Sequence, residues 1–147
     1  MRALLCLLVL GISCGTPKPA GVELLAAPAQ GEVAPLVRAE LARAKRDRRR
    51  LLVYVGASWC EPCRRFHEAA KAGALDKAFP GLRLYELDRD RDEERLVAAG
   101  YTSRLIPLLA VPAADGRASG RQMEGSVKGD GAVAEMTPRL TALLASP

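Results

Sequence analysis

The chain has 147 residues, of which 49% are hydrophobic and 27% are charged, and its formal net charge is +5. This is ordinary globular composition, and after a leader and a linker about 110 residues remain, enough for one compact domain with its own core. The chain holds one Trp, three Tyr and two Phe. The interleaved aromatic residues of a single-strand nucleic-acid binder are therefore missing, and we expect no nucleic-acid partner.

The N-terminus predicts a secretory signal over residues 1–13. Met1-Arg2 is a short positive start, and Ala3–Ile12 is an apolar run too short to span a bilayer as a helix. The run ends with Ser13 directly before Cys14. This ending resembles the bacterial lipobox, although Gly11 stands where that family favours leucine. The resemblance implies that Cys14 is lipidated, which would make the protein a membrane-anchored lipoprotein of the periplasm.

Two alternatives to lipidation remain open, a plainly cleaved protein that is secreted or soluble in the periplasm, and an uncleaved anchor or cytosolic chain. Residues 14–32 are expected to hold the lipidated cysteine and a flexible linker, because Pro17 and Pro19 interrupt any helix there. Residues 22–25 have a second interpretation as a short docked strand. The domain itself is expected to span residues 33–147.

A basic run, residues 45–50, follows the first expected helix and supplies much of the net charge. Cations at a helix C-terminus complement the helix dipole, so a solvated helix end is the first interpretation. Contact with an acidic lipid surface and contact with an acidic partner remain as alternatives.

Hydrophobic periodicity predicts eight elements and one short helical turn after the linker. The first half has a helix over 33–45, a buried strand over 51–57, a helix over 60–72 and a short helical turn over 74–79. A strand from 82 to 87 and a helix over 88–99 follow. The chain then continues with a strand over 106–111, a turn at 114–117, a strand over 121–124 and a closing helix over 131–145. Apart from the short turn, the order is helix, strand, helix, strand, helix, strand, strand, helix. Such an order favours an α/β fold with a parallel half and an antiparallel half.

Two cysteines, Cys60 and Cys63, lie two residues apart where the first buried strand gives way to a helix. This spacing suits a dithiol–disulfide couple, and a helix N-terminus stabilises a thiolate. The other two cysteines, Cys6 and Cys14, lie in the first fifteen residues, and Cys6 would leave with the signal. No further cysteine exists for a structural disulfide framework, so the fold must depend on its hydrophobic core.

The run Trp59-Cys60-Glu61-Pro62-Cys63 in this context, with Ile106-Pro107 downstream, resembles the thioredoxin superfamily over residues 33 to 145. The Asp115-Gly116 turn and Gly125 fit the same resemblance. It implies a thioredoxin fold, a central mixed sheet of about four strands flanked by helices. The Glu-Pro dipeptide is similar to the membrane-tethered TlpA/ResA-type reductases, whereas the compact layout is closer to the C-terminal domain of DsbD-type interchange proteins.

The resemblance also implies roles for individual residues. Cys60 would attack a partner disulfide, and Cys63 would resolve the mixed disulfide. A cis peptide bond at Ile106-Pro107 would face both sulfurs. Supporting positions are the covering Trp59, Glu61 and Pro62, together with Ile106 and Pro107.

The chain departs from thioredoxins proper at two positions, because Tyr54 replaces their buried acid and Leu108 follows the proline in place of the usual threonine. Glu61 has two interpretations, a substitute for that acid or a solvated side chain. His67, one turn after Cys63, has two as well, a group that tunes a sulfur or an ordinary surface histidine.

These features predict an extracytoplasmic thiol–disulfide oxidoreductase that reduces protein disulfides. It would need no cofactor besides the Cys60–Cys63 couple, and its partners would be substrate disulfides and a membrane or periplasmic dithiol that donates electrons. We expect a monomer. The alternatives are a disulfide oxidant or isomerase on the same fold, and a copper- or zinc-binding module, for which only His67 could join the two cysteines. Attachment of c-type haem is excluded because Arg64, not histidine, follows Cys63.

Overall fold

The computed structural model describes residues 21–146, so the expected signal, Cys6 and Cys14 lie outside the described residues. Strands and helices alternate along most of this range. The elements are β1 (Glu23–Ala26), α1 (Val33–Arg46), β2 (Arg50–Gly56), α2 (Glu61–Lys71), β3 (Leu82–Asp88), α3 (Arg89–Ala98), β4 (Leu108–Pro112), β5 (Ala118–Glu124) and α4 (Ala132–Ala145).

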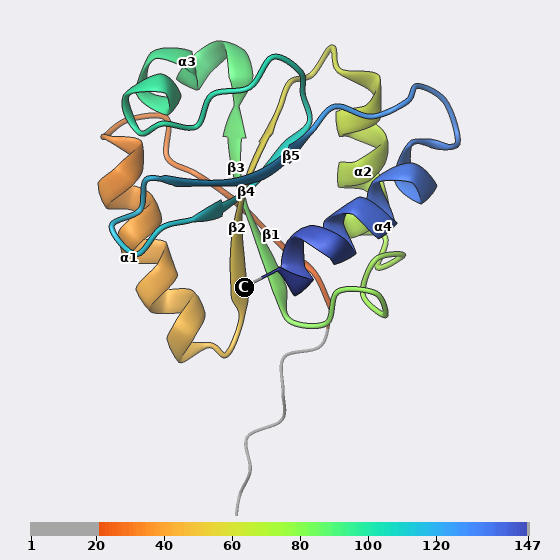
Figure 1. Ribbon diagram of the computed structural model, residues 1–147, viewed down its shortest axis with the longest axis horizontal. Coiled ribbons are helices and arrows are strands. Elements are labelled where there is room, and N and C mark those ends of the chain that lie inside the picture. Colours follow the sequence, from red (N-terminus) through yellow and green to blue (C-terminus); the bar gives the residue numbers. More distant parts are fainter. Residues whose placement is uncertain (1–20, 147) are drawn as a thin grey trace, which may run out of the picture.

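The strands form one mixed sheet in the order β1-β3-β2-β4-β5 (Figure 1). β1, β3 and β2 are parallel to one another, and β4 and β5 add an antiparallel hairpin to the other side of β2. The expected α/β architecture, with a central mixed sheet flanked by helices, is confirmed. The sheet has five strands among the described residues instead of about four, because β1 adds an edge strand.

Strand β1 corrects the expected linker, which was to reach residue 32. Leu24 and Leu25 pack into the core on opposite faces of the sheet, and the backbone N–H of Val22 donates to Asp76 at 2.7 Å. The Glu23 carboxylate accepts a hydrogen bond from the side chain of Arg83 on β3. The domain therefore begins well before residue 33. Four residues are too few to show a periodic pattern, which is why the sequence left this strand as an alternative.

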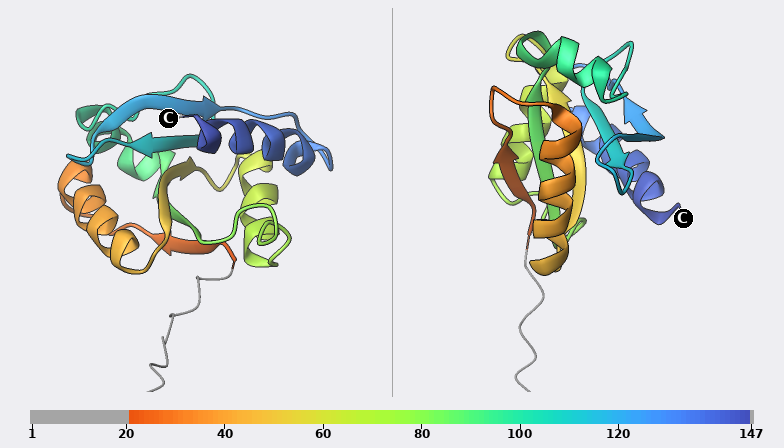
Figure 2. Two further views of the ribbon diagram at one scale, coloured as in Figure 1. Left: turned by 60° about the horizontal axis from the view of Figure 1, so that its bottom comes forward. Right: turned by 90° about the vertical axis from the view of Figure 1, so that its left-hand side faces the viewer.

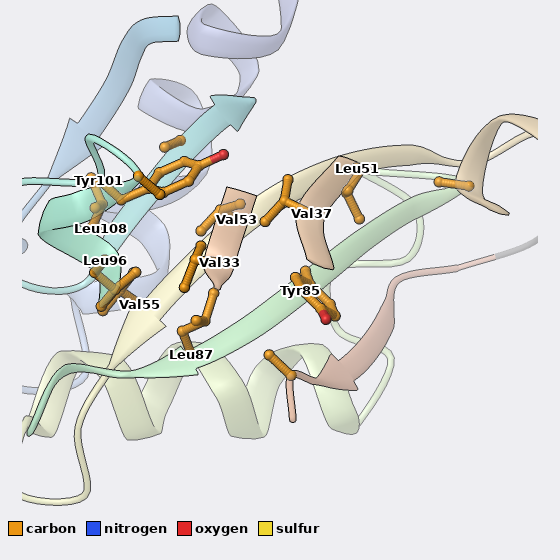
Figure 3. Packing of buried hydrophobic residues seen from close by; sticks show 14 residues of the cluster. Val33, Val37, Leu51, Val53, Val55, Tyr85, Leu87, Leu96, Tyr101 and Leu108 are labelled. Carbon is orange, nitrogen blue, oxygen red and sulfur yellow. The ribbon is translucent and has the colours of Figure 1, made fainter. Parts of the chain in front are cut away.

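Strand β2 separates two hydrophobic cores, because neighbouring side chains on a strand point to opposite faces. Leu51, Val53 and Val55 face α1 and α3, whereas Leu52 and Tyr54 face α2 and α4. Figure 2 shows the sheet between α1 and α2, and Figure 3 shows the first core, where the valines of α1 pack on β2. The sheet is thus covered on both faces, which explains the continuous apolar run of this central strand.

Most expected elements agree with the observed bounds to within two or three residues. The segment 74–79 does not extend into a full helix, but the backbone N–H of Phe79 donates to the carbonyl oxygen of Leu75 at 2.9 Å, as in a single helical turn. Leu75 and Phe79 are buried in the core. β4 starts at Leu108 and not at Ile106, because proline has no N–H to donate to a sheet. β5 starts at Ala118, three residues earlier than expected.

The basic run lies where α1 ends and β2 begins. Lys45 and Arg46 are exposed in the last turn of α1, and the Arg49 side chain lies 2.8 Å from the Glu23 carboxylate. The helix-end interpretation fits this placement. Contacts with lipid or with an acidic partner are not tested by it.

Two glycines in the β4–β5 hairpin allow a matched test of the packing of this hairpin on α1. Gly116 and Gly120 have almost the same positive φ, 86° and 84°. A Cβ at Gly116 would lie 2.0 Å from the carbonyl oxygen of Ala34 in α1, whereas a Cβ at Gly120 meets nothing within 4 Å. Gly120→Ala should therefore lower the free energy of unfolding by about 1 kcal/mol, the cost of a left-handed backbone. Gly116→Ala should lower it by about 2 kcal/mol more, because α1 must shift.

Urea denaturation of both variants beside the unchanged chain measures the difference. Equal losses in the two variants would contradict the close packing of the hairpin on α1.

Candidate active site

Cys60 and Cys63 form a disulfide at the N-terminus of α2, with their Cα atoms 5.2 Å apart. Cys60 is the N-cap residue, and the backbone N–H of Cys63 donates to the Cys60 sulfur at 3.2 Å. Pro62 lies in the first turn, where the absence of an N–H costs little. The local sequence thus places one sulfur at the positive end of the helix, where a thiolate is stabilised.

Both cysteines are nearly buried, with 5% of Cys60 and 3% of Cys63 exposed. They pack with Ala57, and Ile106 covers them from the loop before β4. The Ile106-Pro107 peptide bond is cis, and the carbonyl oxygen of Ile106 lies 3.8 Å from the Cys60 sulfur. The expected cis proline that faces the sulfurs is therefore confirmed.

Trp59 lies at the rim of the site and is 63% exposed. Its indole N–H donates to the carboxylate of Asp90 at 2.7 Å. Asp90 belongs to the first turn of α3, whose N-cap is Asp88. The sequence analysis missed Asp90, because only the fold brings α3 close to the motif.

Glu61 does not take the place of a buried acid near the sulfurs. Its carboxylate accepts a hydrogen bond from Arg65 at 3.0 Å and one from the backbone N–H of Gly129 at 3.3 Å. The hydrogen bond from Arg65 holds the pKa of the Glu61 carboxyl below its usual value. These partners keep Glu61 ionised and bound on the side of α2 that carries Arg65.

Tyr54 connects β2 directly to the motif. Its hydroxyl donates to the carbonyl oxygen of Cys63 at 2.9 Å, and its ring lies 5.8 Å from the ring of Phe66. Gly56 permits this approach, since a Cβ there would lie 3.3 Å from both the Tyr54 hydroxyl and the Cys63 Cβ. Burial raises the pKa of the Tyr54 phenol, and the nearby charge of Glu86 raises it further. The phenol therefore stays protonated at neutral pH.

A cavity of about 410 Å³ opens beside Cys63, between α2 and the ends of β2 and β3. Its polar lining includes Tyr54, His67 and Glu86. The Nδ1 atom of His67 lies 2.7 Å from the carboxylate of Glu86. Sequence reasoning had noted His67 but missed Glu86, which pairs in register with Tyr54 across β2 and β3. The one sequence feature that could have indicated Glu86 was an acidic residue between the apolar positions of β3.

No group of three or more His, Cys, Asp and Glu side chains suitable for a metal ion occurs within residues 21–146. In the same part of the chain, no helix has the length and apolar character to cross a membrane.

No protein-family model and no curated protein matches the chain. Among solved structures it is similar to a mutant thioredoxin from Halobacterium salinarum NRC-1, with a TM-score of 0.48 and 19% sequence identity. The similarity covers 88% of this chain and 92% of that one.

The hydrogen bond between Tyr54 and Cys63 should contribute measurably to stability. Tyr54→Phe removes only the hydroxyl, so we expect the free energy of unfolding to fall by about 1 kcal/mol. Tyr85 is a control, since it lies on the opposite face with the same small exposed fraction, and within residues 21–146 its hydroxyl reaches solvent instead of a hydrogen-bond partner. Tyr85→Phe should change the free energy by less than about 0.5 kcal/mol. Denaturant titration of both variants checks this, and equal effects would argue against a stabilising role for the bond.

Proposed function

We propose that the chain is a thiol–disulfide oxidoreductase that reduces disulfides of other proteins through Cys60 and Cys63. The observation that carries this proposal is the pair of sulfurs closed into a disulfide at the start of α2, with the Ile106 carbonyl oxygen 3.8 Å from the Cys60 sulfur. A thiolate at that place is stabilised by the N-terminus of α2. It also lies beside the backbone of Ile106, with which an extended substrate segment could pair. A purely structural disulfide would not need either feature.

In the reductive cycle, the Cys60 thiolate attacks one sulfur of a substrate disulfide and the other substrate sulfur leaves as a thiolate, which takes up a proton. Cys63 then loses its proton and attacks the Cys60 sulfur. The bond between Cys60 and the substrate breaks, and the second substrate thiolate leaves and is protonated. The substrate has gained two electrons and two protons, and Cys60 and Cys63 are joined in the disulfide that the structure contains.

The surroundings of Cys60 suit contact with a substrate chain. Trp59, directly before Cys60, and Leu105, directly before Ile106, expose 63% and 61% of their surfaces. Each side chain directly precedes a residue that packs at the disulfide, and exposed apolar side chains beside a reactive group are suited to contact with a partner. We assign these two side chains to the docking of an extended segment of the substrate protein, which would pair with the backbone at Ile106.

Loss of the nucleophile should abolish activity. Cys60→Ser should eliminate the reduction of insulin disulfides, because no other thiol occupies the N-cap position of α2. Cys63→Ser should still form the first mixed disulfide but fail to resolve it, so a covalent adduct of enzyme and substrate should accumulate. Turbidity of reduced insulin measures the first effect, and non-reducing electrophoresis measures the second. Unchanged insulin reduction by Cys60→Ser would refute the proposal.

The direction of electron flow follows from the potential of the couple, which we expect near or below about −250 mV, as for reductants on this kind of scaffold. The full chain with Cys6→Ser and Cys14→Ser leaves one couple to titrate in dithiol and glutathione buffers, with alkylation and mass shift as the measurement. A value above about −180 mV would indicate an oxidant or isomerase. No reversible two-thiol transition would indicate a structural or metal-bound motif.

We also place the protein outside the cytoplasm, held to the membrane by a lipid on Cys14, with electrons supplied by a membrane or periplasmic dithiol. The support is the leader and its cysteine, together with the oxidising character of such compartments, in which a reductant needs a donor. Cys14→Ser should move the protein from the membrane fraction to the soluble fraction, whereas Cys6→Ser should leave it in the membrane fraction. Fractionation of expressing cells measures this, and the same distribution for both variants would exclude a lipid on Cys14.

A further inference from the structure

Resolution of the mixed disulfide requires Cys63 to lose a proton, and this inference rests on the proposed function. A free thiol has a pKa of about 8.5, so most of it is protonated at neutral pH. Cys63 is only 3% exposed, so bulk water has little access to its sulfur. A base that lines the cavity beside Cys63 would speed this loss at neutral pH.

Two nearby groups are unsuited to this task. The Tyr54 phenol is already protonated at neutral pH, and its hydroxyl is bound to the Cys63 carbonyl. The Glu61 carboxylate is held by Arg65 and the backbone N–H of Gly129, and it does not line the cavity beside Cys63.

We propose that His67, oriented by Glu86, accepts the proton of Cys63 through the cavity that all three residues line. His67 lies four residues after Cys63 on α2, so both side chains lie on the same face of the helix. An ionised carboxylate only accepts hydrogen bonds, so Nδ1 of His67 donates to Glu86 and Nε2 is the ring nitrogen that can take a proton. The cavity of about 410 Å³ has polar groups in its lining and is large enough for water to connect the two side chains.

The other charged groups that line the cavity have partners of their own or lie at its edge. From α2, Arg64 donates to the carbonyl oxygen of Ser58, and Glu68 is exposed. From β3, Asp88 accepts the backbone N–H groups that begin α3. From α3, Arg91 is paired with Asp92. Glu68 is therefore the one carboxylate of the cavity that binds no other group within residues 21–146, whereas the His67–Glu86 pair joins an imidazole to a carboxylate that stabilises its charged form.

In the proposed step, the proton moves from the Cys63 sulfur to Nε2 of His67 while the Cys63 thiolate attacks the Cys60 sulfur. The carboxylate of Glu86 stabilises the imidazolium that results. His67 then returns the proton to the leaving substrate thiolate or to solvent, so the pair is unchanged over the cycle. His67 does not contact the substrate, so we expect it to affect only the rate at which Cys63 resolves the mixed disulfide.

A reaction with 5,5′-dithiobis(2-nitrobenzoate) separates the two halves. In the full chain with Cys6→Ser and Cys14→Ser, attack by Cys60 releases one nitrothiobenzoate at a rate that depends on reagent concentration, and attack by Cys63 releases a second at a rate that does not. His67→Gln should leave the first rate unchanged and slow the second at pH 7 by about tenfold or more, somewhat below what a fully positioned base contributes. Above pH 9 the second rate should return to that of the parent, because the thiol then ionises without help.

One further variant tests the role of Glu86, and another serves as a control. Glu86→Gln preserves the shape of the partner but removes its charge, so it should slow the second release in the same direction. Glu68→Gln removes a carboxylate from the same helix that is not bonded to His67, and it should change neither rate. A second release that is as fast at pH 7 in both His67→Gln and Glu86→Gln as in the parent would overturn the inference, as would a slowing that persists above pH 9. A parent that releases no second nitrothiobenzoate would instead refute the proposed function, and this inference with it.

Discussion

The close approach of the first turn of α2 to the end of β2 determines the whole candidate site. It depends on Gly56, which leaves no Cβ between the strand and Cys63, and on Tyr54, whose hydroxyl binds the Cys63 carbonyl at 2.9 Å. The approach fixes where the helix begins, and with it the position of the Cys60 sulfur as N-cap. It also brings Ile106 over both sulfurs. The position of both sulfurs relative to the sheet therefore depends on this contact between strand and helix.

The far side of the sheet is organised by charge as well as by apolar packing. Arg83 is 6% exposed and Glu40 is 2% exposed, and their side chains lie 2.6 Å apart. Arg83 also binds Glu23 on β1 and Asp47 after α1. Buried ion pairs of this kind add little net stability, because desolvation offsets the attraction. Their effect here is positional, since one guanidinium holds β1 and the end of α1 against β3.

The sequence was sufficient for those features that repeat or that lie close together along the chain. The periodic segments predicted the helices and the four main strands, and the spacing of Cys60 and Cys63 predicted where the two sulfurs meet. The cis bond at Ile106-Pro107 came only from resemblance to a family. β1 could be given only as an alternative, because it is four residues long and is held by Arg83, sixty residues away from Glu23. The contact between Trp59 and Asp90 was not predicted from the sequence, because it joins two elements that no local pattern connects.

The two carboxylates near the motif show how sequence proximity can mislead about chemistry. Glu61 stands between the cysteines, yet its bonds to Arg65 and Gly129 stabilise the ionised form, and a carboxylate stabilised in this way is a weaker base. Glu86 is more than twenty residues away, yet strand pairing places it beside Tyr54 and its bond to His67 places it in the cavity that Cys63 lines. Beside Tyr54, the neighbouring strand and the next turn of α2 supply a carboxylate and an imidazole on the same side of the sheet. The register between β2 and β3 therefore decides which acidic residue can serve Cys63, and a shift of one residue would turn Glu86 to the opposite face.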